Sequence, residues 1–258
     1  MSLKLAVGGK GGVGKTTVTA LLARAMASSD RRVIAIDADP VTNLASALGI
    51  SEKEPITPIS ELSDLIAERT GAKPGTMGGF FKLNPKVDDI PDRFSRERDG
   101  VKLLVMGTVQ SGGSGCICPE STILKALMQH LVLYRNEVVV MDMEAGVEHL
   151  GRATSGSVDA LLIIVNPGVR SHEAARRIRR LGRDIGIKRF LVLGNRVQGE
   201  ADRQAIAQAL ADFEFLGFLP ELEEVAAADR DGRRPFDRAG SIPKECFELA
   251  EKLLSLSS

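Results

Sequence analysis

Short runs of apolar residues alternate along the chain with longer segments of helical periodicity. The runs cover residues 4–7, 33–36, 101–106, 138–141, 160–165, 190–193 and 215–219, and most are flanked by Gly, Asp, Asn or Pro. Such runs are typical of strands buried on both faces, because helices cover a parallel sheet from either side. The pattern therefore predicts an α/β fold with a mostly parallel, roughly seven-stranded sheet between two layers of helices.

Helical periodicity appears between these runs, at residues 17–28, 121–134, 171–184 and 201–212. A last helix is expected after Pro243, since proline suits a first helical turn. Its packed side would present Phe247, Leu249, Leu253 and Leu254. No repeat or linker divides the chain, so a single domain over residues 1–258 is the simplest prediction.

The segment from about 55 to 100 does not follow this alternation. Pro and Gly interrupt it at Pro74, Gly75, Gly78, Gly79, Pro85 and Pro91, with a short helical pattern only at 59–69. We expect a surface excursion here. An insertion of this length between two strands is more often functional or an interface than idle.

Composition narrows the classes of function. Lys and Arg number 34 and Asp and Glu number 34, so the net charge is zero and bulk attraction to nucleic acid or anionic lipid is not expected. No apolar stretch approaches the roughly 18 residues that span a bilayer. No signal-peptide pattern precedes the first strand, so a cytoplasmic location is the expectation.

A phosphate-binding loop follows the first predicted strand and opens the first predicted helix. Its sequence is Gly-Lys-Gly-Gly-Val-Gly-Lys-Thr, from Gly9 to Thr16. Backbone N–H groups of such a P-loop wrap phosphates, the lysine reaches the outer phosphates and the Thr hydroxyl ligates Mg²⁺. The expected contacts with ATP or ADP are Gly9, Gly11, Gly12, Val13, Gly14, Lys15, Thr16 and Thr17, with Thr16 also on Mg²⁺.

Lys10 departs from the ordinary P-loop. A second, early lysine is not needed to hold a nucleotide in the same subunit, so Lys10 could reach across a dimer. Residues 10–17 resemble the deviant Walker A motif of the MinD, ParA, ArsA and nitrogenase iron protein class. This resemblance implies a face-to-face homodimer in which Lys10 of one subunit contacts the nucleotide phosphates of the other.

Carboxylates end two of the predicted strands. Asp37 and Asp39 follow the second strand, near the edge where open α/β sheets bind ligands. The resemblance identifies this segment as switch I, with Asp39 positioning the attacking water and Asp37 near Mg²⁺. The alternative for Asp39 is a cap on a helix at 42–48. Asp142 follows the fourth predicted strand, as in a Walker B motif, so it would hold Mg²⁺ through water. The N–H of Gly146, a few residues later, would sense the γ-phosphate.

Base recognition is expected from later strand ends, at Asn195, Pro220 and Glu221. An Asn amide can read the edge of adenine, and Asn195 matches the position at which the resembled class uses Asn. The alternative is an Asn that satisfies its own turn. Together these residues predict phosphoryl transfer to water, with Lys10, Lys15 and Asp39 as the catalytic side chains.

Two of the three cysteines, Cys116 and Cys118, lie at the end of a glycine-rich loop at 111–120. Pro119 suits the first helical position, which predicts Cys118 as an N-cap whose thiolate the helix favours. Two thiolates are half of a four-coordinate site, and a symmetric dimer supplies the rest for Ni²⁺ or Zn²⁺. The alternative is a pair of small buried residues. Cys246, beside Phe247, is expected to be in the core.

The cysteine pair together with the P-loop resembles the CooC family of nickel-handling ATPases. Supporting segments include Leu-Asn-Pro-Lys-Val-Asp at 83–88, Gly-Ser-Gly-Cys-Ile-Cys-Pro-Glu at 113–120 and Met-Asp-Met-Glu-Ala-Gly-Val-Glu-His-Leu-Gly-Arg at 141–152. The resemblance implies a dimeric ATPase that binds Ni²⁺ and assists its insertion into apo carbon monoxide dehydrogenase.

Two rival functions stay open at this point: an iron–sulfur cluster carrier or reductase, and a positioning ATPase like MinD or ParA. The tail carries Glu245, Glu248 and Glu251 against Lys252, which disfavours stable membrane attachment. His149 could report nucleotide state, although a solvated loop histidine is favoured. The arginines of helix 171–184, with Arg170, are expected to form a solvated face, docking of an acidic partner being the lesser alternative.

Overall fold

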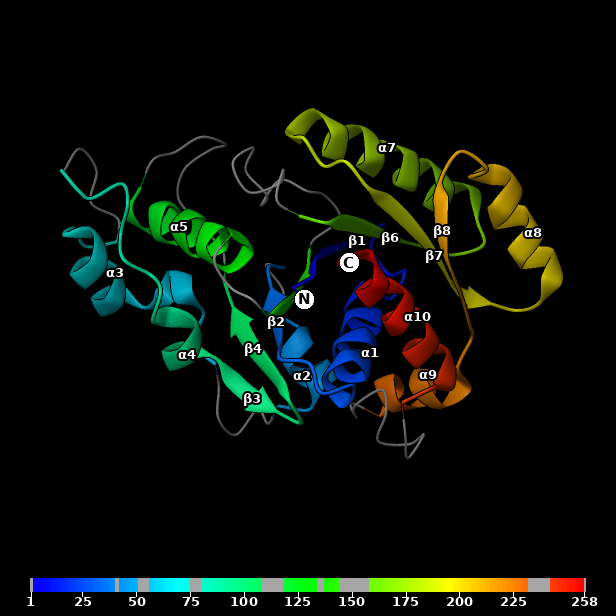
Figure 1. The fold of residues 1–258 in the computed structure, drawn as a ribbon, viewed down its shortest axis with the longest axis horizontal. Coiled ribbons are helices and arrows are strands. Elements are labelled where there is room, and N and C mark those ends of the chain that lie inside the picture. Colours follow the sequence, from blue (N-terminus) through cyan, green and yellow to red (C-terminus); the bar gives the residue numbers. More distant parts are fainter. Residues whose placement is uncertain are drawn as a thin grey trace.

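The computed structural model describes residues 2–39, 42–50, 56–74, 80–107, 118–133, 137–143, 158–231 and 242–257. Within them one sheet runs in the order β3-β4-β2-β5-β1-β6-β7-β8 (Figure 1). The strands are β1 (Lys4–Gly9), β2 (Val33–Asp37), β3 (Arg96–Arg98), β4 (Val101–Val105), β5 (Val138–Asp142), β6 (Ala160–Val165), β7 (Phe190–Val197) and β8 (Glu214–Pro220). All neighbouring pairs are parallel except β3 with β4. The predicted fold class is confirmed.

Helices cover both faces of the sheet (Figure 1). One layer contains α1 (Lys15–Ser28), α2 (Leu44–Leu48) and α10 (Lys244–Leu254), and the other contains α3 (Ser63–Thr70), α5 (Pro119–Leu133), α7 (Val169–Ile185) and α8 (Glu200–Ala209). The short helices α4 (Ile90–Phe94) and α9 (Glu223–Arg230) complete the described helices of five residues or more. Period-two alternation sends Leu5 and Val7 into the first layer's core and Ala6 into the second, all three fully buried.

Strand β3 was not predicted, and its surroundings explain why. Its three residues are Arg96, Glu97 and Arg98, the first two exposed, at the edge of the sheet. Charged side chains protect a sheet edge from pairing with other chains, so such a strand lacks the apolar pattern that reveals the others. The prediction also ended β7 too early, at 193, because the strand continues through polar residues to Val197.

The P-loop lies where the order of the sheet reverses. Strand β1 pairs with β5 on one side and β6 on the other, and the chain leaves β1 through α1 to reach β2, beyond β5. Open α/β sheets bind ligands at such a reversal, outside the carboxyl ends of the strands. In register, Val7 on β1 and Asp37 on β2 both pair with Asp142 on β5. The topology thus brings the predicted phosphate and Mg²⁺ residues to one edge.

The excursion packs over the layer that contains α5. Helix α3 contacts α5, and Leu65 and Ile66 of α3 lie in the core of that layer. The excursion also meets the end of β4, where the Ser60 N–H donates to the carbonyl of Met106 at 3.1 Å. Residues 108–117, which contain Cys116, lie outside the described residues, but the two positions that flank them, Gly107 and Cys118, do not. Excursion residues therefore contact both elements that flank the cysteine loop, β4 with Gly107 and α5.

Gly107 allows the tightest of these contacts. Its φ is +72°, and a Cβ placed on it would lie 2.1 Å from the Ser60 Oγ and 2.6 Å from the Pro58 Cβ. Only glycine fits both the left-handed backbone and the space.

We expect Gly107→Ala to lower the free energy of unfolding by about 2–4 kcal/mol, because it adds a clash with the side chains of Pro58 and Ser60 to the strain of a positive φ. Gly71→Ala is the matched control, since Gly71 has φ +84° with no heavy atom within 4 Å of its Cβ position. The control should lose about 1 kcal/mol. Urea unfolding of both variants measures the difference, and equal losses would contradict the contact at Gly107.

Candidate nucleotide-binding site

The P-loop passes from β1 directly into α1, which begins at Lys15, two residues earlier than predicted. The Val18 N–H donates to the carbonyl of Gly14 at 2.9 Å, so the loop closes into the first turn of the helix. Gly14 has φ +92°. Val13 is buried, and Lys15 is 9% exposed. The backbone of the loop is therefore fixed at the helix N-terminus, where N–H groups without helical partners can bind phosphate.

Asn195 joins strand β7 to this loop. Its Nδ2 donates to the carbonyl of Val13 at 2.9 Å, and a Cβ on Gly14 would lie 2.7 Å from that nitrogen. The amide nitrogen is therefore engaged with the loop, and Oδ1 is the atom that an adenine amino group could meet. Asn195 lies inside β7 rather than after it, and its side chain reaches across to a loop 182 residues away in sequence rather than closing its own turn.

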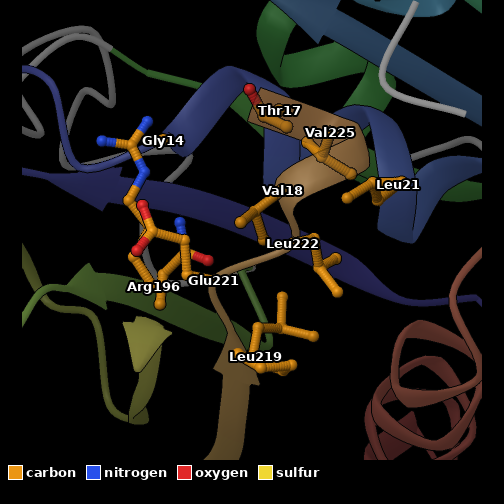
Figure 2. A pocket seen from close by; sticks show the side chains of 11 residues that line it. Gly14, Thr17, Val18, Leu21, Arg196, Leu219, Glu221, Leu222 and Val225 are labelled. Atoms are coloured by element: carbon orange, nitrogen blue, oxygen red, sulfur yellow. The ribbon is translucent and has the colours of Figure 1, made fainter. Parts of the chain in front are cut away.

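A pocket of about 280 Å³ lies beside the loop and contains the three residues predicted for base recognition (Figure 2). Apolar side chains from α1, β8 and α9 group on one side of it, and Arg196 and Glu221 lie on the other. The apolar part is lined by Val18, Leu21, Leu219, Leu222 and Val225. Its shape and chemistry fit a flat apolar base with a polar edge.

Sequence reasoning missed Arg196, which lines the same pocket. It adopts φ +57°, and its Nη1 donates to the carbonyl of Gly12 at 3.4 Å. A left-handed backbone at a residue other than glycine costs energy and is often found at ligand sites. The sequence does place Arg196 directly after Asn195 at the end of an apolar run, which could have drawn attention to it. The left-handed backbone at Arg196 explains how both side chains reach the P-loop.

The buried carboxylates Asp37 and Asp142 lie on neighbouring strands at the edge of the sheet. Asp37 is fully buried, and its two oxygens accept the N–H groups of Leu44 at 3.0 Å and Asp39 at 3.2 Å. Asp142 is 1% exposed, and its Oδ1 has no hydrogen-bond partner. The N–H at the start of α2 is thus bound by Asp37, whereas the cap considered in the sequence was Asp39.

Burial raises the pKa of both carboxyl groups. The pKa of Asp37 rises from 3.8 to about 6, and that of Asp142 from 3.8 to about 7, with the charge of each neighbouring aspartate adding to the rise at Asp142. A hydrogen bond from Thr16 and the charge of Lys15 act in the opposite direction on Asp142. Mg²⁺ prefers oxygen ligands, and the Asp142 Oδ1 is a buried oxygen without a partner among the described residues, in a region of excess negative charge. These features fit a Mg²⁺ site. Thr16, Asp37 and Asp142 are the residues that would hold the ion.

Lys10, unlike Lys15, is exposed. It lines a hollow of about 410 Å³ with Gly11, Gly12 and the turn between β6 and α7. No ion pair involves it among the described residues.

Cys118 caps helix α5 as predicted, because α5 begins at Pro119 and the Ser121 N–H donates to the Cys118 Sγ at 3.4 Å. The Thr122 N–H also donates to the Cys118 carbonyl at 3.0 Å. Cys118 is partly exposed. Cys116, Gly146 and His149 lie outside the described residues, and the predictions made for them stay predictions.

The structure also tests the expectations for Cys246 and for the arginines of α7. Cys246 is fully buried, as expected, and burial raises the pKa of its thiol to about 12. On α7, Arg170, Arg177 and Arg180 are exposed as predicted. Arg179 is not merely solvated, because it pairs with Asp212 and lies 3.7 Å from the centroid of the Phe213 ring.

The sequence of the chain matches a known family of nucleotide-binding proteins. The family described as the CobQ/CobB/MinD/ParA nucleotide-binding domain matches residues 4–236. The chain therefore belongs to this family of P-loop nucleotide-binding proteins, and the site is a nucleotide site of that class.

Within the family, the chain is 44% identical over 254 residues to the carbon monoxide dehydrogenase accessory protein CooC of Rhodospirillum rubrum, covering 98% of this chain and 96% of that protein. It is 42% identical over 259 residues to an uncharacterized ATP-binding protein of Methanocaldococcus jannaschii, covering 99% of each chain. The predicted resemblance to CooC is confirmed by the first of these matches.

Solved structures share the fold. The cell division protein MinD of Aquifex aeolicus superposes with a TM-score of 0.69 at 23% identity, covering 97% of this chain and 96% of that one. MinD of Pyrococcus horikoshii in complex with Mg-ADP superposes with a TM-score of 0.69 at 20% identity, covering 100% and 98%. Among the described residues, no helix combines the length and apolar character needed to cross a membrane.

The raised pKa of Asp142 predicts a pH-dependent gain in stability for Asp142→Asn. Because the folded chain holds the Asp142 proton more tightly than the unfolded chain, the contribution of this group to the free energy of unfolding falls as pH rises from about 4 to about 7 and then stays level. Asparagine carries no charge at any of these pH values. Without Mg²⁺ or nucleotide, Asp142→Asn should therefore be more stable than wild type by about 1–3 kcal/mol at pH 8, with the gain lost near pH 4.

Denaturant unfolding at the two pH values measures this gain. The control is Asp88→Asn, which removes an exposed carboxylate paired with Lys86 at 3.6 Å and should change stability little at either pH. A gain for Asp142→Asn that is the same at pH 4 and pH 8 would show that buried charge is not its source.

Proposed function

We propose that this protein is a dimeric, ATP-hydrolysing nickel chaperone that assists nickel insertion into carbon monoxide dehydrogenase in the cytoplasm. The observation that carries the proposal is the sulfur-capped start of α5, at Cys118, in a chain 44% identical to a carbon monoxide dehydrogenase accessory protein. Cys118, whose sulfur caps the helix, is separated from Cys116 by one residue. The P-loop of the chain also resembles that of a class whose members form dimers.

Hydrolysis breaks the bond between the γ-phosphorus of ATP and the oxygen that leaves with ADP, while water supplies the new oxygen. Lys15 neutralises charge on the outer phosphates, and Asp39, which follows Asp37 in the same turn, orients the water. Thr16, Asp37 and Asp142 would hold Mg²⁺, which would supply further charge neutralisation at the phosphates. The pocket with Asn195 and Glu221 holds the base and so positions the phosphates.

Lys10 acts in trans. Its exposure at the outer side of the P-loop leaves its charge for the nucleotide of a second subunit. Charge from the partner appears at the phosphates only when two subunits close, so hydrolysis depends on dimer formation. The dimer state in turn depends on which nucleotide is bound, provided that ATP binds one state more tightly.

Nickel is the cargo of this cycle. Each subunit contributes Cys116 and Cys118, and two subunits together supply four thiolates, which suit Ni²⁺ or Zn²⁺. The Ser121 N–H donates to the Cys118 Sγ at 3.4 Å and so fixes this sulfur at the start of α5. Hydrolysis changes the dimer, and the metal then passes to the apo enzyme.

Mixing two inactive variants tests the role of Lys10. Lys10→Ala and Lys15→Ala should each lose at least about 100-fold in ATP turnover as homodimers, because each removes charge from the transferred phosphoryl group. In a mixed dimer, the Lys10→Ala subunit keeps its own Lys15 and receives Lys10 from its partner, so that one site is complete. An equimolar mixture should recover about a quarter of wild-type turnover by random pairing of subunits. A mixture that stays inactive would place Lys10 in its own subunit's site.

Metal capture is tested by anaerobic dialysis against Ni²⁺ with ATP, with ADP or without nucleotide, with dimer state measured on the same samples. The wild type should bind one nickel per dimer, and Cys116→Ser with Cys118→Ser should bind none, since a hydroxyl is a poor soft ligand. Cys246→Ala is the control and should bind as wild type. A cysteine-dependent visible absorption that bleaches with reductant would instead indicate an iron–sulfur cluster.

A further inference from the structure

The excursion carries a groove on its outer side. The groove holds about 470 Å³ between the start of α3 and the end of α4. Leu62, Leu65 and Phe94 line it with apolar surface, and Leu62 and Phe94 are only partly buried. An apolar hollow open to solvent costs free energy unless another surface covers it.

The rim of this groove is acidic. Glu61, Asp64 and Glu68 line it and are exposed. Among the described residues, Glu61 and Asp64 form no ion pair, and Glu68 lies 3.3 Å from the Nε of Arg69. Arg93 stands on the opposite rim, where its charge is bound by Asp89 at 2.9 Å. The rim therefore presents net negative charge around an apolar floor, which complements a basic segment with large apolar side chains.

Further apolar side chains are exposed on the same excursion. The large apolar residues most exposed in the described chain are Phe80, Leu83 and Val169, and the first two belong to the excursion. The Lys82 N–H donates to the carbonyl of Thr70 at 2.8 Å, which fixes this stretch to the end of α3. Apolar surface thus extends along the excursion beyond the groove.

The excursion is also joined to the part of the chain that carries the cysteines. Helix α3 packs on α5, whose first turn is capped by Cys118 (Figure 1). A Cβ on Gly107, the last described residue before the cysteine loop, would lie within 3 Å of Pro58 and Ser60. A protein bound in the groove would therefore contact a segment that itself packs on α5 and against Gly107.

We propose that the groove between α3 and α4 is the docking site for a basic amphipathic segment of the protein that receives the metal. This inference rests on the proposed delivery function, because that function requires the cysteine loop to face a client protein. The large apolar side chains of the segment occupy the floor formed by Leu62, Leu65 and Phe94, while its Lys and Arg side chains lie against Glu61 and Asp64.

The test measures binding of the full-length protein to apo carbon monoxide dehydrogenase from nickel-starved cells, immobilised on a sensor. Glu61→Lys with Asp64→Lys reverses the charge of the rim, and Glu61→Gln with Asp64→Asn removes it. The control is Glu245→Lys with Glu251→Lys, the same reversal at two exposed positions of α10, which packs on the opposite face of the sheet. Melting curves, ATP turnover and nickel per dimer are measured on every variant.

The charge reversal should weaken binding at least about tenfold and the neutral pair by less, with the control within about twofold of wild type. Binding of the wild type should weaken as salt rises. ATP turnover, nickel content and melting should be unchanged throughout. Equal losses in the groove variant and the control, an unchanged affinity in the groove variant, or no binding of the wild type would each overturn the docking site.

These outcomes separate the docking site from the delivery function. A wild type that binds no nickel, yet binds the apo enzyme in a manner that charge reversal weakens, would refute the chaperone proposal and support the groove. The opposite result is a wild type that binds nickel, together with groove variants that bind the enzyme as tightly as the wild type does. That result would support the chaperone proposal and refute the docking site.

Discussion

The candidate site is built around two carboxylates that are buried side by side at the edge of the sheet. Parallel pairing of β2 with β5 puts Asp37 opposite Asp142, and both are almost completely shielded from water. Burying like charges this way is unfavourable, and raised pKa values express that cost. A cation and the Lys15 ammonium would relieve this cost, so the proposed metal–nucleotide complex would restore the stability that the two carboxylates cost in its absence. The sheet supplies this edge because its order reverses at β1.

Much of this arrangement could be predicted from the sequence. Strands buried on both faces appear as apolar runs, and the P-loop lies in the required place between one such run and a helix. The cap at Cys118 could be predicted because Pro119 marks the first helical position. Strand β3 could not, since its residues are charged, nor could Arg196, because its role depends on a left-handed backbone that no side-chain pattern encodes.

Long-range contacts were the other limit of prediction. The sequence indicates an excursion through its Gly and Pro residues, but it does not reveal that the start of the excursion contacts Met106 and that its helix α3 packs on α5. Similarly, the Arg pattern of α7 predicts exposure, whereas Arg179 binds Asp212 and the Phe213 ring because β8 returns alongside β7. Pairings of this kind follow from topology, which decides which distant residues meet.

The bond between Asn195 and the Val13 carbonyl has a consequence for the order of events at the site. It links the strand that borders the base pocket to the phosphate loop, so the two halves of the nucleotide meet one preorganised surface. Little conformational entropy is then lost at the loop when the base arrives. For a nucleotide bound as proposed, base identity would contribute to affinity through contact within the pocket, and the shape of the loop would not depend on it.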